Sequence, residues 1–179
     1  EDYYWDVLKH TYTCDGSVTI ETQTKYVTKV TANHLDTKNN HNVHGLLIVH
    51  QRDLETFPRG IHEHFRNLRG IDFEGCGLTS ISSNDLMHLP HLLQVSLDDN
   101  KIVELPHDLF VHNPKIQRID LEGNPLLHIG STIFKPLPDL RSVFMRHTSC
   151  TSENSLAFNH QEIKNLEWEI LIECPATYE

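Results

Sequence analysis

The sequence predicts an α/β repeat protein, a solenoid of about five 24-residue repeats whose strands form a concave parallel β-sheet. Three observations support this prediction. Similar segments begin at Leu68, Leu92, Ile116 and Leu140, and each starts 24 residues after the one before. Apolar and polar residues alternate early in each segment, as in a strand with one buried face. A cysteine or asparagine then recurs at the ninth position, where the chain has to turn.

The repeats read LRGIDFEGCGLTSI from Leu68, LLQVSLDDNKIVEL from Leu92, IQRIDLEGNPLLHI from Ile116 and LRSVFMRHTSC from Leu140. A further step of 24 residues back reaches His44, where HGLLIVHQRDLETF keeps the pattern with weaker identities. The predicted inward pairs of the five strands are Leu47 and Val49, Ile71 and Phe73, Val95 and Leu97, Ile119 and Leu121, and Val143 and Met145. Stacked coils of this kind bury a continuous core that no single repeat could make.

The ninth position of each repeat is expected to turn inward and to satisfy backbone groups of the neighbouring coil. It holds Cys76, Asn100 and Asn124 in the central repeats, and Arg52 and Thr148 in the first and last. The inward asparagine or cysteine is expected to be replaced in the first and last repeats, because these repeats adjoin the caps. On the convex side, a further apolar row is predicted from Leu86, Leu89, Phe110, Phe134 and Leu137.

The pattern L-x-x-L-x-L-x-x-N/C-x-L-x-x-L resembles the leucine-rich repeat family over about residues 43 to 150. The resemblance implies one structural domain in three parts. These are an N-terminal cap at 1–42, leucine-rich repeats at 43–149 and a C-terminal cap at 150–179.

Both caps have recognisable patterns of their own. Residues 17–32 alternate as a β-hairpin would, and such a hairpin would cover the open N-terminal end. The preceding residues, 3–12, fit either a helix or an extended arm. The C-terminal segment has helical spacing at Leu156, Ile163 and Leu166, followed by a strand-like tail.

The chain has four cysteines, and they have different expected roles. Cys76 occupies the inward position and is predicted to be a buried free thiol. Extracellular leucine-rich repeat proteins commonly staple their C-terminal cap, so the resemblance implies a disulfide between Cys150 and Cys174, in an oxidising compartment. Cys14 is then either an exposed thiol that pairs with a second chain, or a thiol buried in the cap or bonded to Cys76.

Charge and motifs exclude several functions. With 25 acidic and 15 basic residues the net charge is -10, which disfavours nucleic acid and anionic membranes as partners. The 14 histidines would offset much of this charge in mild acid. No apolar run is long enough to span a bilayer.

The sequence also lacks the motifs of common catalytic and metal sites. It has no nucleophile-elbow, P-loop or C-x-x-C motif, and His62 with His64 does not complete a metal-binding motif. We therefore expect neither an enzyme nor a bound cofactor or metal.

The candidate partner surface is the outward face of the strands. Its predicted binding residues are Leu46, Ile48, His50, Asp72, Glu74, Asp98, Asp99, Arg118, Asp120, Glu122, Phe144 and Arg146. Neighbouring strands are about 4.8 Å apart, so Glu74, Asp98 and Glu122 should form a ladder of like charges. Such a stripe attracts a basic protein, while the apolar residues and arginines at its ends would anchor that protein. A solvated acidic face without a partner, or a divalent cation between the carboxylates, are the alternatives.

The histidine-rich, degenerate repeats are also similar to those of secreted insect leucine-rich immune proteins of the mosquito type. This resemblance implies a non-catalytic secreted protein of innate immunity that binds an extracellular protein. It also implies a disulfide-linked or non-covalent dimer, with Cys14 as the linking thiol. Two other hypotheses are direct recognition of a microbial glycolipid or glycan, and an ectodomain fragment of a leucine-rich repeat receptor or adhesion protein.

Overall fold

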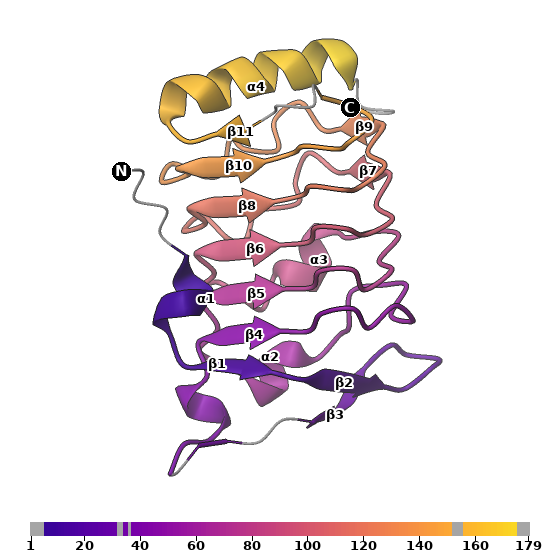
Figure 1. The fold of residues 1–179 in the computed structure, drawn as a ribbon, viewed down its shortest axis with the longest axis vertical. Helices are drawn as coiled ribbons and strands as arrows, with labels where there is room; N and C mark the ends of the chain where they lie inside the picture. The colour runs from indigo at the N-terminus through magenta and orange to yellow at the C-terminus, as the bar shows by residue number, and fades with distance from the viewer. Residues whose placement is uncertain (1–5, 32–33, 36, 152–155, 175–179) are drawn as a thin grey trace.

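The computed structural model describes residues 6–31, 34–35, 37–151 and 156–174. The chain winds into stacked coils, and each coil contributes one short strand to a sheet that runs the length of the molecule (Figure 1). The order in this seven-stranded sheet is β1-β4-β5-β6-β8-β10-β11, and every neighbouring pair is parallel except β10 and β11. The strands are β1 (Thr13–Asp15), β4 (Gly45–Leu47), β5 (Gly70–Asp72), β6 (Gln94–Ser96), β8 (Arg118–Asp120), β10 (Ser142–Phe144) and β11 (Leu156–Ala157).

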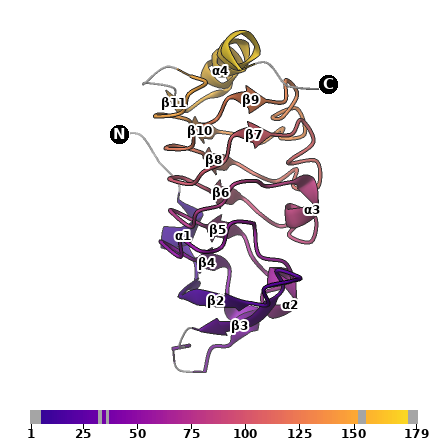
Figure 2. The ribbon, with the colours of Figure 1, turned by 90° about the vertical axis from the view of Figure 1, so that its right-hand side faces the viewer.

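The opposite side of each coil is irregular, with short helices and a two-stranded parallel ladder (Figure 2). Its elements are α2 (Ile61–His64), α3 (Ser83–Leu86), β7 (Glu104–Leu105) and β9 (His128–Ile129). At the ends of the solenoid lie α1 (Val7–His10), the hairpin strands β2 (Ser17–Ile20) and β3 (Val27–Thr31), the 3-10 helix η1 (Asn40–Asn42) and α4 (His160–Glu173). No helix in the described ranges is both long enough and apolar enough to cross a membrane.

The core fills the space between the sheet and the convex side. The predicted inward pairs from Ile71 and Phe73 through Val143 and Met145 are fully buried. The predicted convex row, from Leu86 to Leu137, is buried as well. Both rows belong to one continuous cluster, which confirms that stacking neighbouring coils makes the core.

The first coil has a different phase from the predicted one. Leu46 pairs with Ile71, so the first step is 25 residues rather than 24. Leu46 and Ile48 are 0% exposed, whereas Leu47 is half-buried and Val49 is exposed. The predicted inward pair is therefore wrong. All residues from Leu46 to Val49 are apolar, so alternation could not decide which face is buried.

The turn after each strand uses the same backbone conformation in all five repeats. The residue before the inward position has a positive φ throughout: His50 (58°), Gly75 (61°), Asp99 (53°), Gly123 (67°) and His147 (56°). Few residues other than glycine, asparagine, aspartate and histidine adopt this left-handed region readily. It turns the chain so that the next side chain enters the core.

Asparagine in the inward position is hydrogen-bonded to two coils. The Nδ2 of Asn100 donates to the carbonyls of Phe73 (2.7 Å) and Leu97 (2.9 Å), and its Oδ1 accepts from Leu78 N (3.0 Å). Asn124 repeats the arrangement one coil later. Cys76 takes the same position as a buried free thiol, as predicted.

The first inward residue is Gln51 rather than Arg52, because of the altered phase. Its amide bonds to both the N–H and the carbonyl of Val18, at 3.0 and 2.8 Å, and so attaches the hairpin to the first coil.

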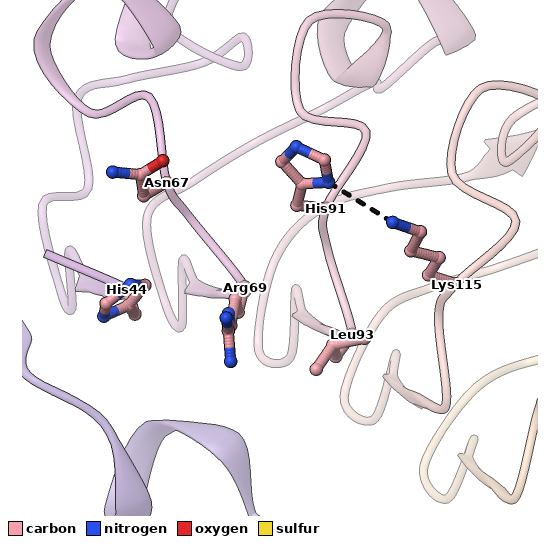
Figure 3. A pocket seen from close by; sticks show the side chains of 6 residues that line it. All are labelled: His44, Asn67, Arg69, His91, Leu93 and Lys115. Carbon is pink, nitrogen blue, oxygen red and sulfur yellow. Dashed lines mark hydrogen bonds between the residues drawn. The ribbon is translucent and has the colours of Figure 1, made fainter. Parts of the chain in front are cut away.

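The residues just before the strands form a regular edge of the sheet, opposite the edge formed by the turns after the strands. Backbone N–H groups donate from one coil to the previous one, from Arg69 to His44 (2.7 Å), Leu93 to Arg69 (2.6 Å) and Gln117 to Leu93 (2.8 Å). Figure 3 shows side chains of this edge lying in two rows. The edge is rigid because each residue is held by the coil beside it.

The N-terminal segment contributes more than the predicted hairpin. Strands β2 and β3 pair antiparallel, which confirms the hairpin. Just before them, β1 adds a strand to the main sheet and pairs Cys14 with Leu46. Cys14 therefore points into the core and is only 7% exposed as a free thiol. The prediction of an exposed thiol is wrong, and the buried alternative is the one observed. Of residues 3–12, Tyr3, Tyr4 and Trp5 lie outside the described residues, and α1 follows them.

The C-terminal end closes with a helix fastened by a disulfide. Cys150 and Cys174 are bonded, as the family resemblance implied. The predicted strand-like tail is wrong, because α4 is helical to Glu173 and buries Ile163, Leu166 and Ile170. Leu156 lies before this helix, in β11, which runs antiparallel to β10 and ends the sheet.

Candidate functional site

The outward face of β5, β6 and β8, with the turns after them, carries a cluster of acidic side chains. Its members, which we call the acidic face, are Asp72, Glu74, Asp98, Asp99, Asp120 and Glu122. The parallel register places Asp72, Ser96 and Asp120 side by side on three successive strands. These six predicted residues are therefore gathered on one surface of the sheet.

Asp98 is at the centre of this face. It accepts a hydrogen bond from Ser96 Oγ at 2.6 Å. Burial, reinforced by the charge of Asp98, raises the pKa of Asp72 to about 7. The same two causes raise the pKa of Asp120 to about 7, against the opposing effect of Arg118. The carboxyl groups of Asp72 and Asp120 thus change charge near neutral pH.

The predicted ladder of like charges is neutralised at one end. Arg146 binds Glu122 through two hydrogen bonds, one from Nε and one from Nη2 (2.9 Å). At the other end, His50 Nε2 lies 3.7 Å from Glu74 Oε1. None of the ion pairs with lysine or arginine in the described ranges involves Asp98 or Asp99.

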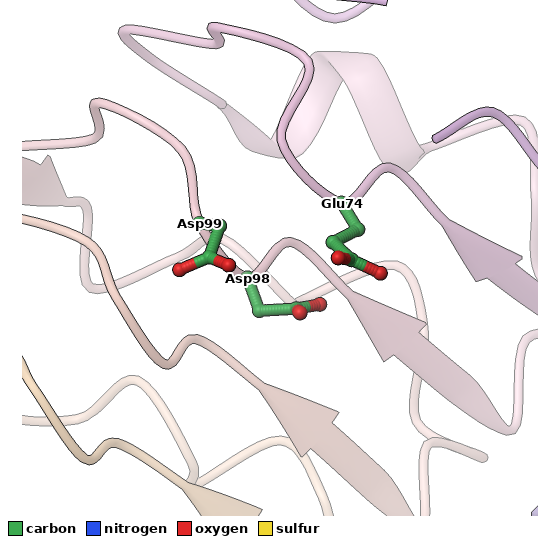
Figure 4. A group of neighbouring side chains, drawn as sticks. All are labelled: Glu74, Asp98 and Asp99. Carbon is green, nitrogen blue, oxygen red and sulfur yellow. The ribbon is translucent and has the colours of Figure 1, made fainter. Parts of the chain in front are cut away.

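Three of these carboxylates converge in space. Each of Glu74, Asp98 and Asp99 offers an oxygen, and these oxygens lie within 4.8 Å of one another (Figure 4). Asp98 is half-buried and Asp99 is exposed. Oxygen ligands of this kind suit a hard divalent cation, and they equally suit a lysine or arginine side chain from a partner.

Two predicted binding residues, one of them a predicted anchor, are not exposed. Phe144 is 6% and Arg118 is 8% exposed. The Arg118 guanidinium lies 4.1 Å from the Phe144 ring centre and 3.2 Å from Asp120. Phe158, after β11, covers Phe144 edge-on with ring centres 5.4 Å apart. Phe158 itself is 49% exposed, and sequence reasoning missed it because it lies outside the repeat.

The other end of the concave face is also closed. Leu46 and Ile48 are core residues, so their predicted contact with a partner is wrong. Helix α1 instead lies over the strand beginnings, where Val7 N donates to Gln94 Oε1 at 2.9 Å. A side chain at Gly70 would approach Leu8 to 2.7 Å, so the lack of one makes room for α1. No periodic signal in the sequence indicated this contact.

The chemistry available on this surface is electrostatic binding. Carboxylates line an open face, and both free thiols are buried. Burial raises the pKa of Cys76 to about 11 and also raises that of Cys14. Neither thiol is therefore a thiolate nucleophile at neutral pH.

Comparisons with known proteins agree with the repeat. Residues 94–149 match the family described as "Leucine rich repeat". Human Toll-like receptor 5 is 28% identical over 146 residues, which cover 74% of this chain and 17% of the receptor. Mouse leucine-rich repeat-containing G-protein coupled receptor 4 is 36% identical over 61 residues, 34% of this chain and 6% of the receptor. The Xenopus tropicalis receptor 5 of the same group is 31% identical over 65 residues, 36% of this chain and 7% of the receptor.

A solved structure shows the same architecture. The match is to "Structure of the Toll - Spatzle complex, a molecular hub in Drosophila development and innate immunity". The TM-score is 0.57 at 22% identity, covering 62% of this chain and 15% of the other. This chain thus spans only a small part of each relative, and at this identity the structural match concerns the fold alone. The fold is a solenoid with a parallel sheet, and the family match, the relatives and the solved structure are all similar to it in being leucine-rich repeat proteins.

Proposed function

We propose that the chain is a non-catalytic, secreted recognition protein that binds a basic extracellular protein through its acidic face. The observation that supports this most is the concentration of carboxylates around Asp98, where burial first, and the charge of Asp98 second, raise the pKa of Asp72 and Asp120 to about 7. Buried like charges oppose folding, and shifted carboxyl groups of this kind cluster at functional sites. Lysine or arginine side chains of a partner would relieve the repulsion and speed the encounter.

The proposed location and biological role have separate support. The disulfide at the C-terminal cap is typical of oxidising, extracellular compartments. The relatives include Toll-like receptor 5, and the Toll–Spatzle complex is described as a hub in development and innate immunity. A role in innate immunity is an extension from these proteins to this chain. The proposal includes a non-covalent dimer. It does not include a dimer linked by a disulfide of Cys14, because that thiol is buried.

A second candidate is that the chain is part of the ectodomain of a leucine-rich repeat receptor. The receptor names among its relatives favour this alternative. Mass spectrometry of the native protein distinguishes the two. A product that carries a membrane-spanning segment in addition to this sequence supports the receptor, and a product without one supports the secreted protein.

A capture experiment tests the acidic face. The bait is the whole chain, immobilised and exposed to native extracellular fluid, with Asp98→Asn/Asp99→Asn as the test variant. Asparagine keeps the size of both side chains and tolerates the left-handed backbone of the second position. The control variant, Asp53→Asn/Asp139→Asn, removes the same charge from exposed residues elsewhere.

The expected result is a basic protein that binds the wild type and the control, elutes with salt and is lost from the test variant. In purified form, its association rate should fall at least tenfold with the test variant, and its salt dependence should flatten. Equal capture by all three baits, or capture of acidic proteins only, contradicts the proposal.

A further inference from the structure

A second charged surface lies at the strand-beginning edge. It is a groove of about 330 Å³ lined by His44, Asn67, Arg69, His91, Leu93 and Lys115 (Figure 3). None of these six described residues is acidic, although the chain as a whole has a net charge of -10. The groove is therefore a local basic site in an acidic protein.

The repeat itself positions these side chains. His44, Arg69 and Leu93 occupy equivalent places in successive coils and are joined by the N–H to carbonyl bonds between those coils. The second row, with Asn67, His91 and Lys115, lies two residues earlier in each repeat. The Nδ2 of Asn67 donates to the His41 carbonyl at 2.8 Å, which fixes its amide. The backbone positions of the groove residues are thus set by bonds between coils, and the Asn67 amide is held in place.

Within the part of the chain that the structure describes, the positive charges of the groove are not matched by carboxylates. None of the ion pairs found in the described ranges involves Arg69 or Lys115. The polar contact of Lys115 is with His91, Nζ to Nδ1 at 3.5 Å. Both cationic side chains are exposed. They are therefore available to an anion from outside.

Distance separates the groove from the acidic face. Three residues run from Arg69 to Asp72, the nearest member of the acidic face, which is roughly 10 Å of extended chain, and five run to Glu74, roughly 16 Å. The Debye length at physiological ionic strength is about 8 Å, so most of the acidic face lies beyond it. Salt therefore screens the two surfaces from each other in large part.

We propose that this groove binds an anionic glycan, meaning a saccharide chain that bears sulfate or phosphate groups. Guanidinium and ammonium groups bind such oxyanions, and the imidazoles and the amide add polar contacts for hydroxyl groups. The lining comes from four coils, about 14 Å from the first to the last, which favours an extended chain over a single ion. Among the described residues, no phenylalanine, tyrosine or tryptophan lines the groove, so these residues provide no platform on which single-stranded nucleic acids could stack their bases.

The binding site is distinct from the acidic face, so its test stands apart from that of the proposed function. The probe is a fluorescent, heparin-derived octasaccharide, and its binding to the whole chain is measured by anisotropy at physiological ionic strength. Arg69→Gln/Lys115→Gln is the test variant. Arg59→Gln/Lys29→Gln removes the same charge from exposed residues outside the groove and is the matched control.

We expect the test variant to bind the octasaccharide at least tenfold more weakly, and the matched control to stay within twofold of the wild type. The acidic-face variant Asp98→Asn/Asp99→Asn should also stay within twofold. Circular dichroism checks that all variants fold. No binding by the wild type, or equal losses in the test and control variants, overturns the proposal.

Competition identifies the ligand class. Neutral dextran of similar length should not displace the octasaccharide, and a single-stranded oligonucleotide of equal charge should displace it at least tenfold less well than unlabelled octasaccharide. Displacement by dextran shows that charge is not recognised, and stronger displacement by the oligonucleotide shows that the ligand is not a glycan. Either result overturns the assignment.

Discussion

Replacing Asp72 by asparagine is expected to stabilise the protein at neutral pH. Asp72 is half-buried on the acidic face, and burial together with Asp98 raises its pKa to about 7 from an ordinary value of 3.8. Its Oδ1 accepts a hydrogen bond from Glu74 N at 3.0 Å, which the asparagine Oδ1 can keep. The substitution therefore removes the charge and preserves the local contact.

The sign of the effect follows from proton binding. Between about pH 4 and pH 7 the folded chain holds a proton on Asp72 that the unfolded chain has released, so the free energy of unfolding falls as pH rises. The folded and unfolded pKa values of Asp72 differ by about 3, and each pH unit of difference corresponds to about 1.36 kcal/mol. The charged carboxylate therefore lowers the free energy of unfolding by at most about 4 kcal/mol above pH 7. Partial solvent screening reduces this, so we expect Asp72→Asn to gain about 2–4 kcal/mol at pH 8 and less than about 1 kcal/mol at pH 4.

Urea unfolding at both pH values measures this gain. Asp139→Asn is the control, because Asp139 is exposed and its replacement should change the free energy of unfolding by less than about 0.5 kcal/mol. A gain that is absent at pH 8, or equally large at pH 4, would refute the account of Asp72. If Asp72→Asn is more stable and also binds the captured partner more weakly, then the charge of Asp72 destabilises the fold but serves partner binding.

Three further predictions concern the solenoid. Asn100→Ala should lower the free energy of unfolding by about 2–5 kcal/mol in urea titrations, because buried backbone groups lose their partners, whereas the exposed Asn67→Ala should cost under about 1 kcal/mol. Removing the disulfide with Cys150→Ser/Cys174→Ser should cost about 3 kcal/mol, and a reductant should then leave the melting temperature unchanged. Gly70→Leu should detach α1, which would appear as faster proteolysis at the N-terminus while the far-UV dichroism of the solenoid is retained.

The sequence predicted the parts of the fold that depend on periodicity. Inward residues such as Val95 and Leu97 are identified wherever polar neighbours mark the opposite face. The same reasoning failed from Leu46 to Val49, because residues on both faces of this strand are apolar. Here the pairing of Leu46 with Ile71 decides which side chains face the core. It also failed for the C-terminal tail, because an apolar run of that length fits a strand or a helix until a neighbouring layer decides.

The candidate site shows the same division. The acidic residues at equivalent positions of neighbouring repeats were placed together correctly, since a parallel register stacks equivalent positions. Their neighbours were not predictable. The closure of Phe144 by Phe158 and the seat of α1 beside Gly70 join residues far apart in sequence, outside any period.

The sequence by itself thus determined the solenoid, its inward asparagines and the line of carboxylates, because each is a local pattern repeated at a fixed interval. Only the tertiary structure decided the phase of the first coil and the burial of Cys14. It also decided which carboxylates are paired with arginine, and that a basic groove forms at the strand beginnings. These features depend on contacts between non-equivalent residues, and their geometry is set when the coils and caps pack against each other.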